Sequence, residues 1–364
     1  MPDGAISVVD RFVESRTGLD PAQERPDPTH GDSAARHSGP LAGPAAPIHS
    51  EESASRPAYR TDSPVLIPDG RATAELCHRP DPEDRFPVEW LRLTEHSFLV
   101  SVNWPAAHRF FAPLPGGYQD PLLVAETTRQ TTMMLAHAEF GVPIGDQFVM
   151  RELGYRVETT EFTVAGASGA IDVVVECTDV QLRAGRLVGM RVDLRFQRLG
   201  RLLATSMGIL GCTSARVYRR LRGERMSVAG RPLPLLPAVA PRETGRGDRK
   251  DVVLAPSRHR PGWRLRLDTT HPTLFARPND HVPGMVLLEA ARQAANVLTP
   301  GHDFHPASMR IAFHKYCELT EPCWILAGPD RSAEQGTVMQ VQGLQQDEPV
   351  FTLTLGGGAP RDGG

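Results

Sequence analysis

Two glutamates give the clearest chemical signal in this sequence, because each lies inside an otherwise apolar segment with helical spacing. Each is followed by Arg and Gln three and four positions later, and each is preceded by a histidine at the same distance. The second set repeats the first at one constant offset along the chain, and such a match predicts a duplicated domain. The two sets are His108, Glu126, Arg129 and Gln130, and His271, Glu289, Arg292 and Gln293.

The role of these carboxylates stays open at this point. On a helix, Glu289, Arg292 and Gln293 lie on one face. A buried carboxylate is costly unless it is paired, so an ion pair that ties the helix to its sheet is one interpretation. A catalytic carboxylate or a polar substrate anchor in a cleft is the other, and the two are compatible. The matched His108 and His271 are more typical of fold determinants, although they also remain candidate substrate contacts.

A second candidate site is the segment Asp280–Met285, with the sequence DHVPGM. Pro-Gly at the start of a helix leaves backbone N–H groups free at the positive end of the helix dipole. These groups suit a thioester carbonyl, an oxyanion or a phosphate. We expect Gly284 and Met285 to supply such donors, with Asp280 and His281 as general base or phosphate contact. The alternative is an ordinary turn in which Gly284 permits close packing.

The corresponding loop of the first repeat has diverged. It contains Gly116-Gly117 and then Asp120-Pro121, so it lacks the Pro-Gly pair. Asp120 is a candidate N-cap, with Pro121 as the first helical residue. It is also a candidate substrate contact if the two repeats once had equal sites.

A basic run near position 220 is either a solvated surface or a docking site. It contains Arg216, Arg219, Arg220 and Arg222. Acyl carrier proteins are acidic, which makes carrier docking a reasonable function for it. Nucleic acid is less favoured, because no aromatic interleaving accompanies the run. Four of the five cysteines fall in strands or beside a turn and are expected to pack. No metal-ligand spacing is found, and no cofactor is expected.

These residues need two long helices and two sheets to position them. Apolar helical patterns run over residues 122–140 and 285–298, and both helices should be buried. Strand patterns follow each helix, at 155–165, 171–180, 189–199 and 202–212, and at 309–320, 323–329, 336–344 and 350–356. One buried helix followed by an antiparallel sheet, twice, predicts an α+β protein with a tandem (double) hotdog arrangement.

Composition divides the chain and excludes several classes. We expect a disordered leader (1–64), a first repeat (65–222), a Pro/Gly/Arg-rich linker (223–262), a second repeat (263–358) and a short tail (359–364). A net charge of −3 in 364 residues argues against bulk nucleic-acid binding. No apolar stretch is long enough to span a bilayer, and no secretory signal or CxxC is present. A cytoplasmic enzyme or binding protein remains.

The motifs DPLLVAETTRQ and DHVPGMVLLEAARQAA together resemble the A-factor biosynthesis (AfsA) hotdog family of actinomycetes, over residues 75–356. The resemblance implies transfer of a β-ketoacyl group from an acyl carrier protein thioester to dihydroxyacetone phosphate. The ester then leads to γ-butyrolactone, butenolide or furan signals that control antibiotic production. It implies no cofactor, and a pseudo-dimeric monomer or a homodimer. On this basis Glu289 would be the base or orienter, and Arg129 or Arg292 would bind phosphate.

Two other classes stay open. The second helix is also similar to that of hydroxyacyl-thioester dehydratases, which carry a catalytic histidine a fixed distance before the glutamate. Phe275 and Ala112 occupy that position in the two repeats, which argues against dehydration. A dehydratase or thioesterase on the same fold, and a non-catalytic acyl- or lactone-binding regulatory protein, are the alternatives.

Overall fold

One antiparallel sheet of 13 strands organises the described part of the chain in this computed structural model, which covers residues 68–164, 170–299, 301, 304–330 and 338–357. These residues belong to one compact unit, Pro68–Gly364. The first-repeat strands are β1 (Gly70–Arg71), β2 (Pro87–Thr94), β3 (Ser97–Val102), β4 (Gln147–Val157), β5 (Ile171–Arg183), β6 (Arg186–Arg198) and β7 (Arg201–Thr213). The second-repeat strands are β8 (Leu254–Pro256), β9 (Trp263–Leu265), β10 (Pro306–Phe313), β11 (Trp324–Pro329), β12 (Val338–Gln345) and β13 (Glu348–Gly357).

The helices are fewer and mostly short. The α-helices are α2 (Ala74–Cys77), α3 (Leu122–Ala138), α4 (Ala215–Arg222) and α5 (Gly284–Leu298). The 3-10 helices are η1 (Pro82–Asp84), η2 (Pro115–Gly117), η3 (Gly223–Val228), η4 (Pro241–Thr244) and η5 (Arg249–Asp251). No helix in the described ranges combines the length and the apolar character needed to cross a lipid bilayer.

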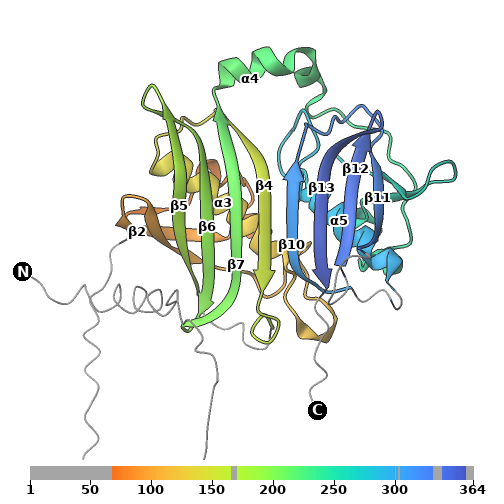
Figure 1. The fold of residues 1–364 in the computed structure, drawn as a ribbon, viewed down its shortest axis with the longest axis horizontal. Helices are drawn as coiled ribbons and strands as arrows, with labels where there is room; N and C mark the ends of the chain where they lie inside the picture. The colour runs from red at the N-terminus through yellow and green to blue at the C-terminus, as the bar shows by residue number, and fades with distance from the viewer. Residues whose placement is uncertain (1–67, 165–169, 300, 302–303, 331–337, 358–364) are drawn as a thin grey trace, which may run out of the picture. The chain divides into compact units, whose positions relative to one another are not determined.

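The strand order shows the duplication directly. Apart from β1, the strand order is β2-β3-β5-β6-β7-β4-β10-β13-β12-β11-β9-β8. Read outward from β4 and from β10, the two halves have the same order, and Figure 1 labels the central strands from β5 to β11. The two halves join where β4 and β10 pair antiparallel, with Tyr155 opposite Met309. The duplication expected from the constant sequence offset is therefore a pair of half-sheets fused into one.

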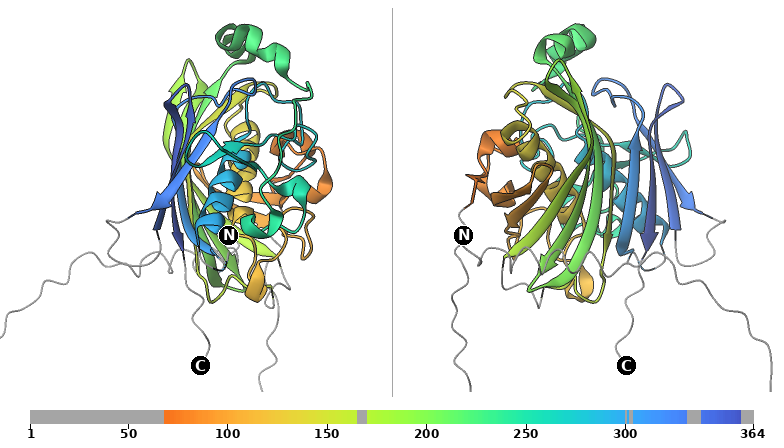
Figure 2. Two further views of the ribbon diagram at one scale, coloured as in Figure 1. Left: turned by 90° about the vertical axis from the view of Figure 1, so that its right-hand side faces the viewer. Right: turned by 60° about the vertical axis from the view of Figure 1, so that its left-hand side comes forward.

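Both long helices lie on the same face of this sheet and contact each other (Figure 2, yellow and light blue). Their side chains are almost all buried, because both helices carry apolar and small residues on all sides. The sheet wraps the two helices, which confirms the expected tandem hotdog fold of the α+β class. Helix α3 begins at Leu122 with Pro121 as its N-cap, one residue later than the predicted Asp120 cap, although the Leu122 N–H donates to Asp120 Oδ1 at 2.9 Å.

Several local predictions differ from the structure. The strand expected at 155–165 is β4, which lies at Gln147–Val157, and turns follow it as far as the described residues extend. Strands β2 and β3, which precede α3, were not predicted; β2 intersperses apolar residues with Glu89 and Arg92, and β3 has only six residues. The expected leader 1–64 and tail 359–364 lie outside the described residues.

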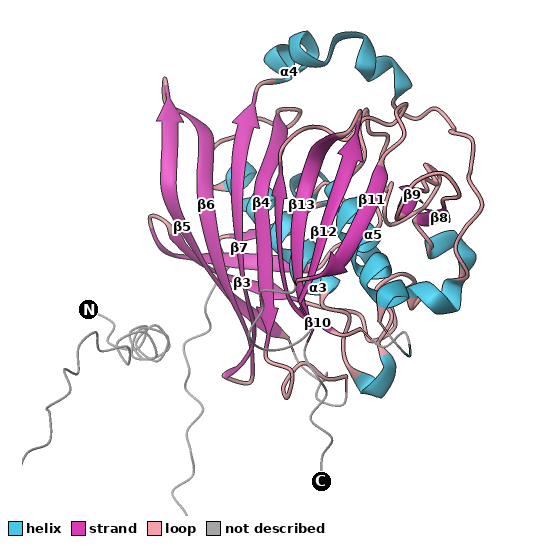
Figure 3. Cartoon of the chain, turned by 45° about the vertical axis from the view of Figure 1, so that its right-hand side comes forward, coloured by secondary structure: helices cyan, strands magenta, loops and turns pink. Residues whose placement is uncertain are grey.

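The segment 223–262, expected to be a linker, packs on the second repeat in its second half. It contributes η4, η5 and β8, the last of which lies beside β9 in Figure 3. The side chains of Val252, Val253 and Leu254 are buried. This stretch is the second-repeat counterpart of the η1–β2 region. The exact domain bounds stay a prediction.

Candidate active site

A cavity of about 340 Å³ lies between α3 and β4 of the first repeat and the start of α5 of the second. Its apolar wall includes Met133, Phe148, Met150, Leu153, Leu287 and Phe313. Its polar wall includes His78, Arg79, Arg129, Arg277, His281 and Lys315. No aspartate or glutamate is among the described residues that line it. This combination suits a ligand with one apolar chain and one anionic group.

The first turn of α5 borders this cavity without a side-chain cap. Pro283 precedes the helix with φ −59° and ψ 140°, and its position offers no side-chain acceptor. N–H groups in a first helical turn have no intrahelical partner and carry partial positive charge. The donors expected at Gly284 and Met285 therefore lie at the cavity. A Cβ on Gly284 would come 3.3 Å from the Phe313 ring, so the glycine also serves close packing.

Asp280 and His281 form a hydrogen-bonded pair immediately before this helix. His281 Nδ1 lies 2.8 Å from Asp280 Oδ1, and the His281 ring lies edge-on to Tyr316 with 4.8 Å between centroids. A carboxylate at Nδ1 holds the proton there and leaves the Nε2 lone pair of the neutral imidazole available. Since His281 lines the cavity, the pair has the arrangement of an oriented general base.

Helix α4 fixes this pair from outside the cavity. The Tyr218 hydroxyl donates to Asp280 Oδ1 at 2.7 Å, and Arg222 Nε donates to Asp280 Oδ2 at 2.7 Å. Burial alone would raise the pKa of Asp280, but the bonds from His281, Arg222 and Tyr218 hold that pKa well below its usual range. The carboxylate therefore stays ionised and orients the imidazole.

Arg222 is consequently unavailable to a docking partner, contrary to the expectation from the sequence. It also donates to both carboxylate oxygens of Glu318, at 2.7 and 2.8 Å, and its side chain is buried. The other three members of the basic run, Arg216, Arg219 and Arg220, are exposed on α4.

The central glutamate of the first repeat is held by two arginines and a glutamine. Glu126 accepts from Arg79 Nε at 2.7 Å, from Arg129 at 3.0 and 2.7 Å, and from Gln130 at 2.6 Å. Burial would raise its pKa, but the charges of Arg129 and Arg79 lower it well below the usual range. Glu126 is not among the residues that line the cavity, whereas Arg79 and Arg129 are.

The second repeat reproduces this network around Glu289. The carboxylate accepts from Arg246 at 2.8 Å twice, from Arg292 at 3.0 and 2.8 Å, and from Gln293 at 2.5 Å. Burial would raise the pKa of Glu289, but the charges of Arg246 and Arg292 lower it to about 2. The side chain is fully buried and outside the cavity, so the geometry does not support the general-base role considered for it.

The outer arginines of the two networks also join the repeats reciprocally. Arg79 of the first repeat donates to the Thr273 carbonyl at 2.8 Å, and Arg246 donates to the Phe110 carbonyl at 2.5 Å. Phe110 and Thr273 are themselves separated by the repeat offset, so the two contacts are equivalent. Glu126 and Glu289 thus anchor a pair of arginine contacts between the repeats.

The matched glutamines and histidines complete the same framework. Gln130 bonds the backbone of Asp84 and Phe86, and Gln293 bonds that of Asp251 and Val253. Nε2 of His108 lies 3.0 Å from Asp84, and Nε2 of His271 lies 3.0 Å from Asp251. Both Nδ1 atoms accept from the backbone N–H groups that follow them. These four side chains hold loops and do not line the cavity, which favours the fold-determinant interpretation.

Sequence reasoning missed five basic residues of the cavity: His78, Arg79, Arg277, His314 and Lys315. The cavity wall partly removes water from the Arg277 guanidinium. This desolvation, together with the charges of Arg129 and Arg79, lowers the pKa of Arg277 to about 10. No hydrogen bond or ion pair joins the Arg277 guanidinium to another residue in the described ranges. The cavity therefore holds positive charge that its own walls do not neutralise. Arg79 had a detectable signal, since R-x-D-x-x-D occurs at Arg79–Asp84 and again at Arg246–Asp251.

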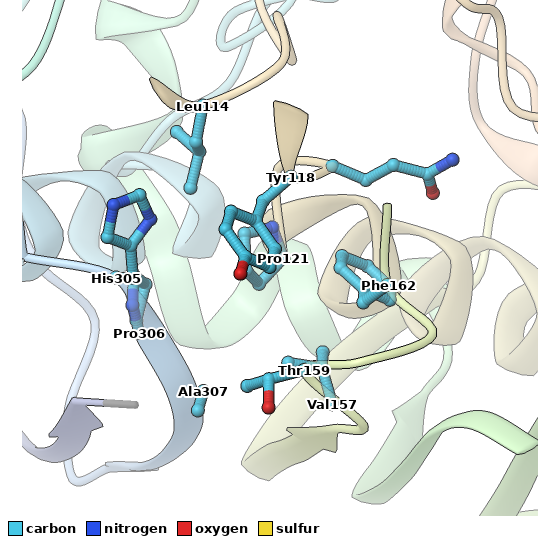
Figure 4. A pocket seen from close by; sticks show the side chains of 10 residues that line it. Leu114, Tyr118, Pro121, Val157, Thr159, Phe162, His305, Pro306 and Ala307 are labelled. Carbon is cyan, nitrogen blue, oxygen red and sulfur yellow. The ribbon is translucent and has the colours of Figure 1, made fainter. Parts of the chain in front are cut away.

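The equivalent position of the other repeat is closed. At the start of α3 the described residues enclose a space of about 30 Å³, lined mainly by apolar groups (Figure 4). Gly117 and Tyr118 occupy the positions of Asp280 and His281, and the Tyr118 ring lies 5.6 Å from that of His305. Arg292, the counterpart of Arg129, is buried. The geometry favours one open half-site in each chain.

Neither a nucleophilic thiol nor a metal cluster is evident among the described residues. Cys317 borders the cavity, but its hydrogen bond with Cys323 and its burial raise its pKa well above the usual value. No group of three or more His, Cys, Asp or Glu side chains in the described ranges could hold a common metal ion.

Comparison with known proteins agrees with this organisation. The model of the A-factor biosynthesis hotdog domain matches residues 68–214 and 229–354, one segment for each repeat. The chain is 43% identical to a 2-oxo-3-(phosphooxy)propyl 3-oxoalkanoate synthase of Streptomyces virginiae, over 78% of this chain and 96% of that protein. It is 41% identical to the Streptomyces griseus subsp. griseus protein of the same name, over 83% of this chain and 95% of that one. The chain therefore belongs to the A-factor biosynthesis hotdog family.

Proposed function

We propose that the protein is an acyltransferase that joins a 3-oxoacyl group from an acyl carrier protein thioester to dihydroxyacetone phosphate. The product is a 2-oxo-3-(phosphooxy)propyl 3-oxoalkanoate, which can cyclise by intramolecular aldol condensation towards a butyrolactone-type signal. One observation carries the proposal: the oriented His281, the uncapped start of α5 and the Arg277 guanidinium, which has no ion-pair partner among the described residues, border one cavity. Carrier thioesters and triose phosphates are cytoplasmic, so the proposal assigns the reaction to that compartment.

His281 acts as the general base in this proposal. Its Nε2 takes the proton of the dihydroxyacetone phosphate hydroxyl, and the hydroxyl oxygen attacks the thioester carbonyl carbon. When the tetrahedral intermediate collapses, the C–S bond breaks and the imidazolium returns the proton to the pantetheine thiolate. Asp280 stabilises the imidazolium through its 2.8 Å contact at Nδ1. The step is a direct transfer, so it needs no covalent acyl-enzyme.

The start of α5 stabilises the negative charge that forms on the thioester oxygen. The Gly284 and Met285 N–H groups are fixed before the reaction begins, and such preorganised donors are worth about 3–4 kcal/mol each in acyl transfer. The arginines that face the cavity, Arg129 and Arg277, bind the phosphate of the acceptor. Arg79 supports them from its ion pair with Glu126.

The acyl chain lies along the apolar wall between α3 and β4, and the carrier protein approaches from α4. The exposed face of α4 presents Arg216, Arg219 and Arg220 beside the exposed Val217 and Leu221. An acidic carrier helix would find both charge and apolar area there. Because Arg222 and Tyr218 on the same helix hold Asp280, this docking face is only one residue layer from the catalytic pair.

Reconstitution with a 3-oxoacyl carrier protein tests the proposal. The purified protein is incubated with the thioester, with and without dihydroxyacetone phosphate, and the products are identified by mass spectrometry. We expect a phosphorylated ester, or the butenolide derived from it, only when both substrates are present. His281→Asn should abolish it, whereas Arg310→Gln, on the exposed face of β10, is the matched control for handling and folding.

The alternatives give different products in the same experiment. Release of free 3-oxo acid without dependence on dihydroxyacetone phosphate would identify a thioesterase. A dehydratase would convert a 3-hydroxyacyl thioester to an enoyl thioester. Binding of thioester without turnover would identify an acyl-binding protein. Any of these results in place of the ester would overturn the proposal.

A further inference from the structure

The two half-sites differ most sharply at the starts of their central helices. In the closed half-site, the Asp120 carboxylate lies at the start of α3 and accepts from the Leu122 N–H at 2.9 Å. The repeat offset places Pro283 and Met285 at the positions equivalent to Asp120 and Leu122. At the start of α5 the acceptor is thus missing, and the helix borders the cavity instead.

The charged residues around Asp120 correspond, in type and in position in the repeat, to those around the open cavity. Its Oδ2 lies 3.8 Å from Arg246 Nη2. Burial raises the pKa of Asp120, and the charges of Arg292 and Arg246 oppose that effect. Arg246 and Arg292 are the counterparts of Arg79 and Arg129. In formal charges, the closed half-site holds two arginines against two carboxylates, Glu289 and Asp120.

The open half-site lacks one of these carboxylates. Arg79 and Arg129 face Glu126 alone, and Arg277 adds a further positive charge whose guanidinium has no partner among the described residues. The vacant place corresponds to the Asp120 side chain, because the residue there is Pro283. A group that is negatively charged and accepts from the Met285 N–H would complete the same arrangement.

We propose that Asp120 is an internal substitute for the thioester oxyanion, and that the residue at this position decides which half-site can turn over. Asp120 fills and closes the half-site at α3, whereas Pro283 leaves the half-site at α5 open to substrate. The repeat offset maps the Asp120 carboxylate onto the start of α5, and this mapped position marks where the oxyanion lies. The oxyanion is then next to the Met285 N–H, on the side of Arg79 and Arg129. This inference rests on the acyltransferase function proposed above.

Moving the carboxylate to α5 tests the inference. Pro283→Asp places an acceptor at an N-cap whose extended φ and ψ suit aspartate, so the helix itself should become more stable. Pro283→Ala is the matched control, because it removes the same ring without adding an acceptor. We expect Pro283→Asp to be at least 30-fold less active than Pro283→Ala, while its Tm is equal or higher. A purely structural disturbance would instead lower activity and Tm together.

Two further arms keep the outcome decisive. Asp120→Asn should lower Tm and leave kcat/KM within about threefold of wild type, since the closed half-site takes no part in turnover. Binding of acetoacetyl-pantetheine, measured by calorimetry, should weaken in Pro283→Asp relative to Pro283→Ala even if no acyl transfer is detected. A wild-type protein that transfers no acyl group refutes the proposed function. Equal activity and equal thioester binding in the two Pro283 variants refute this inference, and so does a large loss of kcat in Asp120→Asn.

Discussion

Glu289→Gln separates the structural interpretation of the central glutamates from the catalytic one. The carboxylate is fully buried and accepts four hydrogen bonds from Arg246 and Arg292. The amide leaves two buried guanidinium groups without their anion, and removal of one partner from a buried ion pair costs about 3–5 kcal/mol. That is a large part of the free energy of unfolding of a typical domain, which is about 5–15 kcal/mol. We therefore expect Tm to fall on the order of 10 °C.

The activity of the folded variant should change much less. Glu289 does not line the cavity, so kcat measured below the new Tm should stay within about fivefold of wild type, a difference of about 1 kcal/mol in the barrier. The assays are thermal unfolding followed by circular dichroism, and acyl transfer followed by mass spectrometry on the same preparation. A variant that keeps the wild-type Tm but turns over slower by two orders of magnitude would refute the reasoning and restore Glu289 as a catalytic group.

The acid side of the stability profile gives an independent check of the same ion pairs. The folded-state pKa of Glu289 is lowered from 4.5 to about 2, so the unfolded chain binds the proton more tightly. The stabilisation is therefore fully present above about pH 4.5 and is lost as the pH falls towards 2. Glu289→Gln should reduce the slope of the free energy of unfolding in this window, measured by urea titration at several pH values. An unchanged slope would contradict the assignment.

The remaining predictions concern the cavity and its surroundings. His281→Asn should lower kcat by about 10²–10⁴-fold with little change in the KM for dihydroxyacetone phosphate, because it removes the proton acceptor; a loss confined to KM would contradict the base role. Arg277→Met should raise that KM by about 10- to 100-fold, the equivalent of a charge-assisted hydrogen bond of about 1.5–3 kcal/mol. The same change should not affect binding of an acceptor without phosphate. Reversal of the three exposed arginines of α4 to glutamate should raise the KM for the carrier-protein thioester, most strongly at low salt, but not for the free pantetheine thioester. Equal effects on both thioesters would exclude α4 as the docking face.

Much of the fold could be predicted because the duplication is visible in the chain. The constant offset between the two motif sets and the two apolar patterns located both central helices closely, although the N-cap of α3 is Pro121 and not the predicted Asp120. The strands before each helix were missed: β8 and β9 have only three residues each, too few to show a period, and β2 and β3 were not recognised either. The second half of the expected linker was misjudged for the same reason. Because it is rich in Gly, Pro and Arg, neither the burial of Arg246 nor the strand β8 was predicted.

The candidate site was only partly predictable. His281, Gly284, Met285 and Arg129 were identified, and the structure brings them to one cavity, with Asp280 bonded to His281 outside its lining. Arg79 and Arg246 were missed because their separation along the chain differs from the common offset of the other matched residues. No local sequence pattern identifies Arg277 as a cavity residue or shows that the Arg222 side chain is ion-paired with Asp280.

The choice between the two half-sites also required three dimensions. Glu126 and Glu289 are followed by the same Arg and Gln along the chain, so the sequence cannot tell which network adjoins an open cavity. The two half-sites differ through residues that lie outside the matched Glu-Arg-Gln motifs. Tyr218 and Arg222 donate to Asp280 beside the start of α5, whereas Asp120 accepts from the Leu122 N–H at the start of α3 and Tyr118 lines the small space there.

A crystal structure with a stable amide analogue of the 3-oxoacyl pantetheine thioester tests the central claim most directly. We expect one ligand per chain, with its carbonyl oxygen within about 3 Å of the Met285 nitrogen and its acyl chain against Met133 and Phe148. His281 Nε2 should face the carbonyl carbon across the space for the acceptor hydroxyl. A ligand at the start of α3, or an acyl carbonyl directed at Glu289, would contradict that claim.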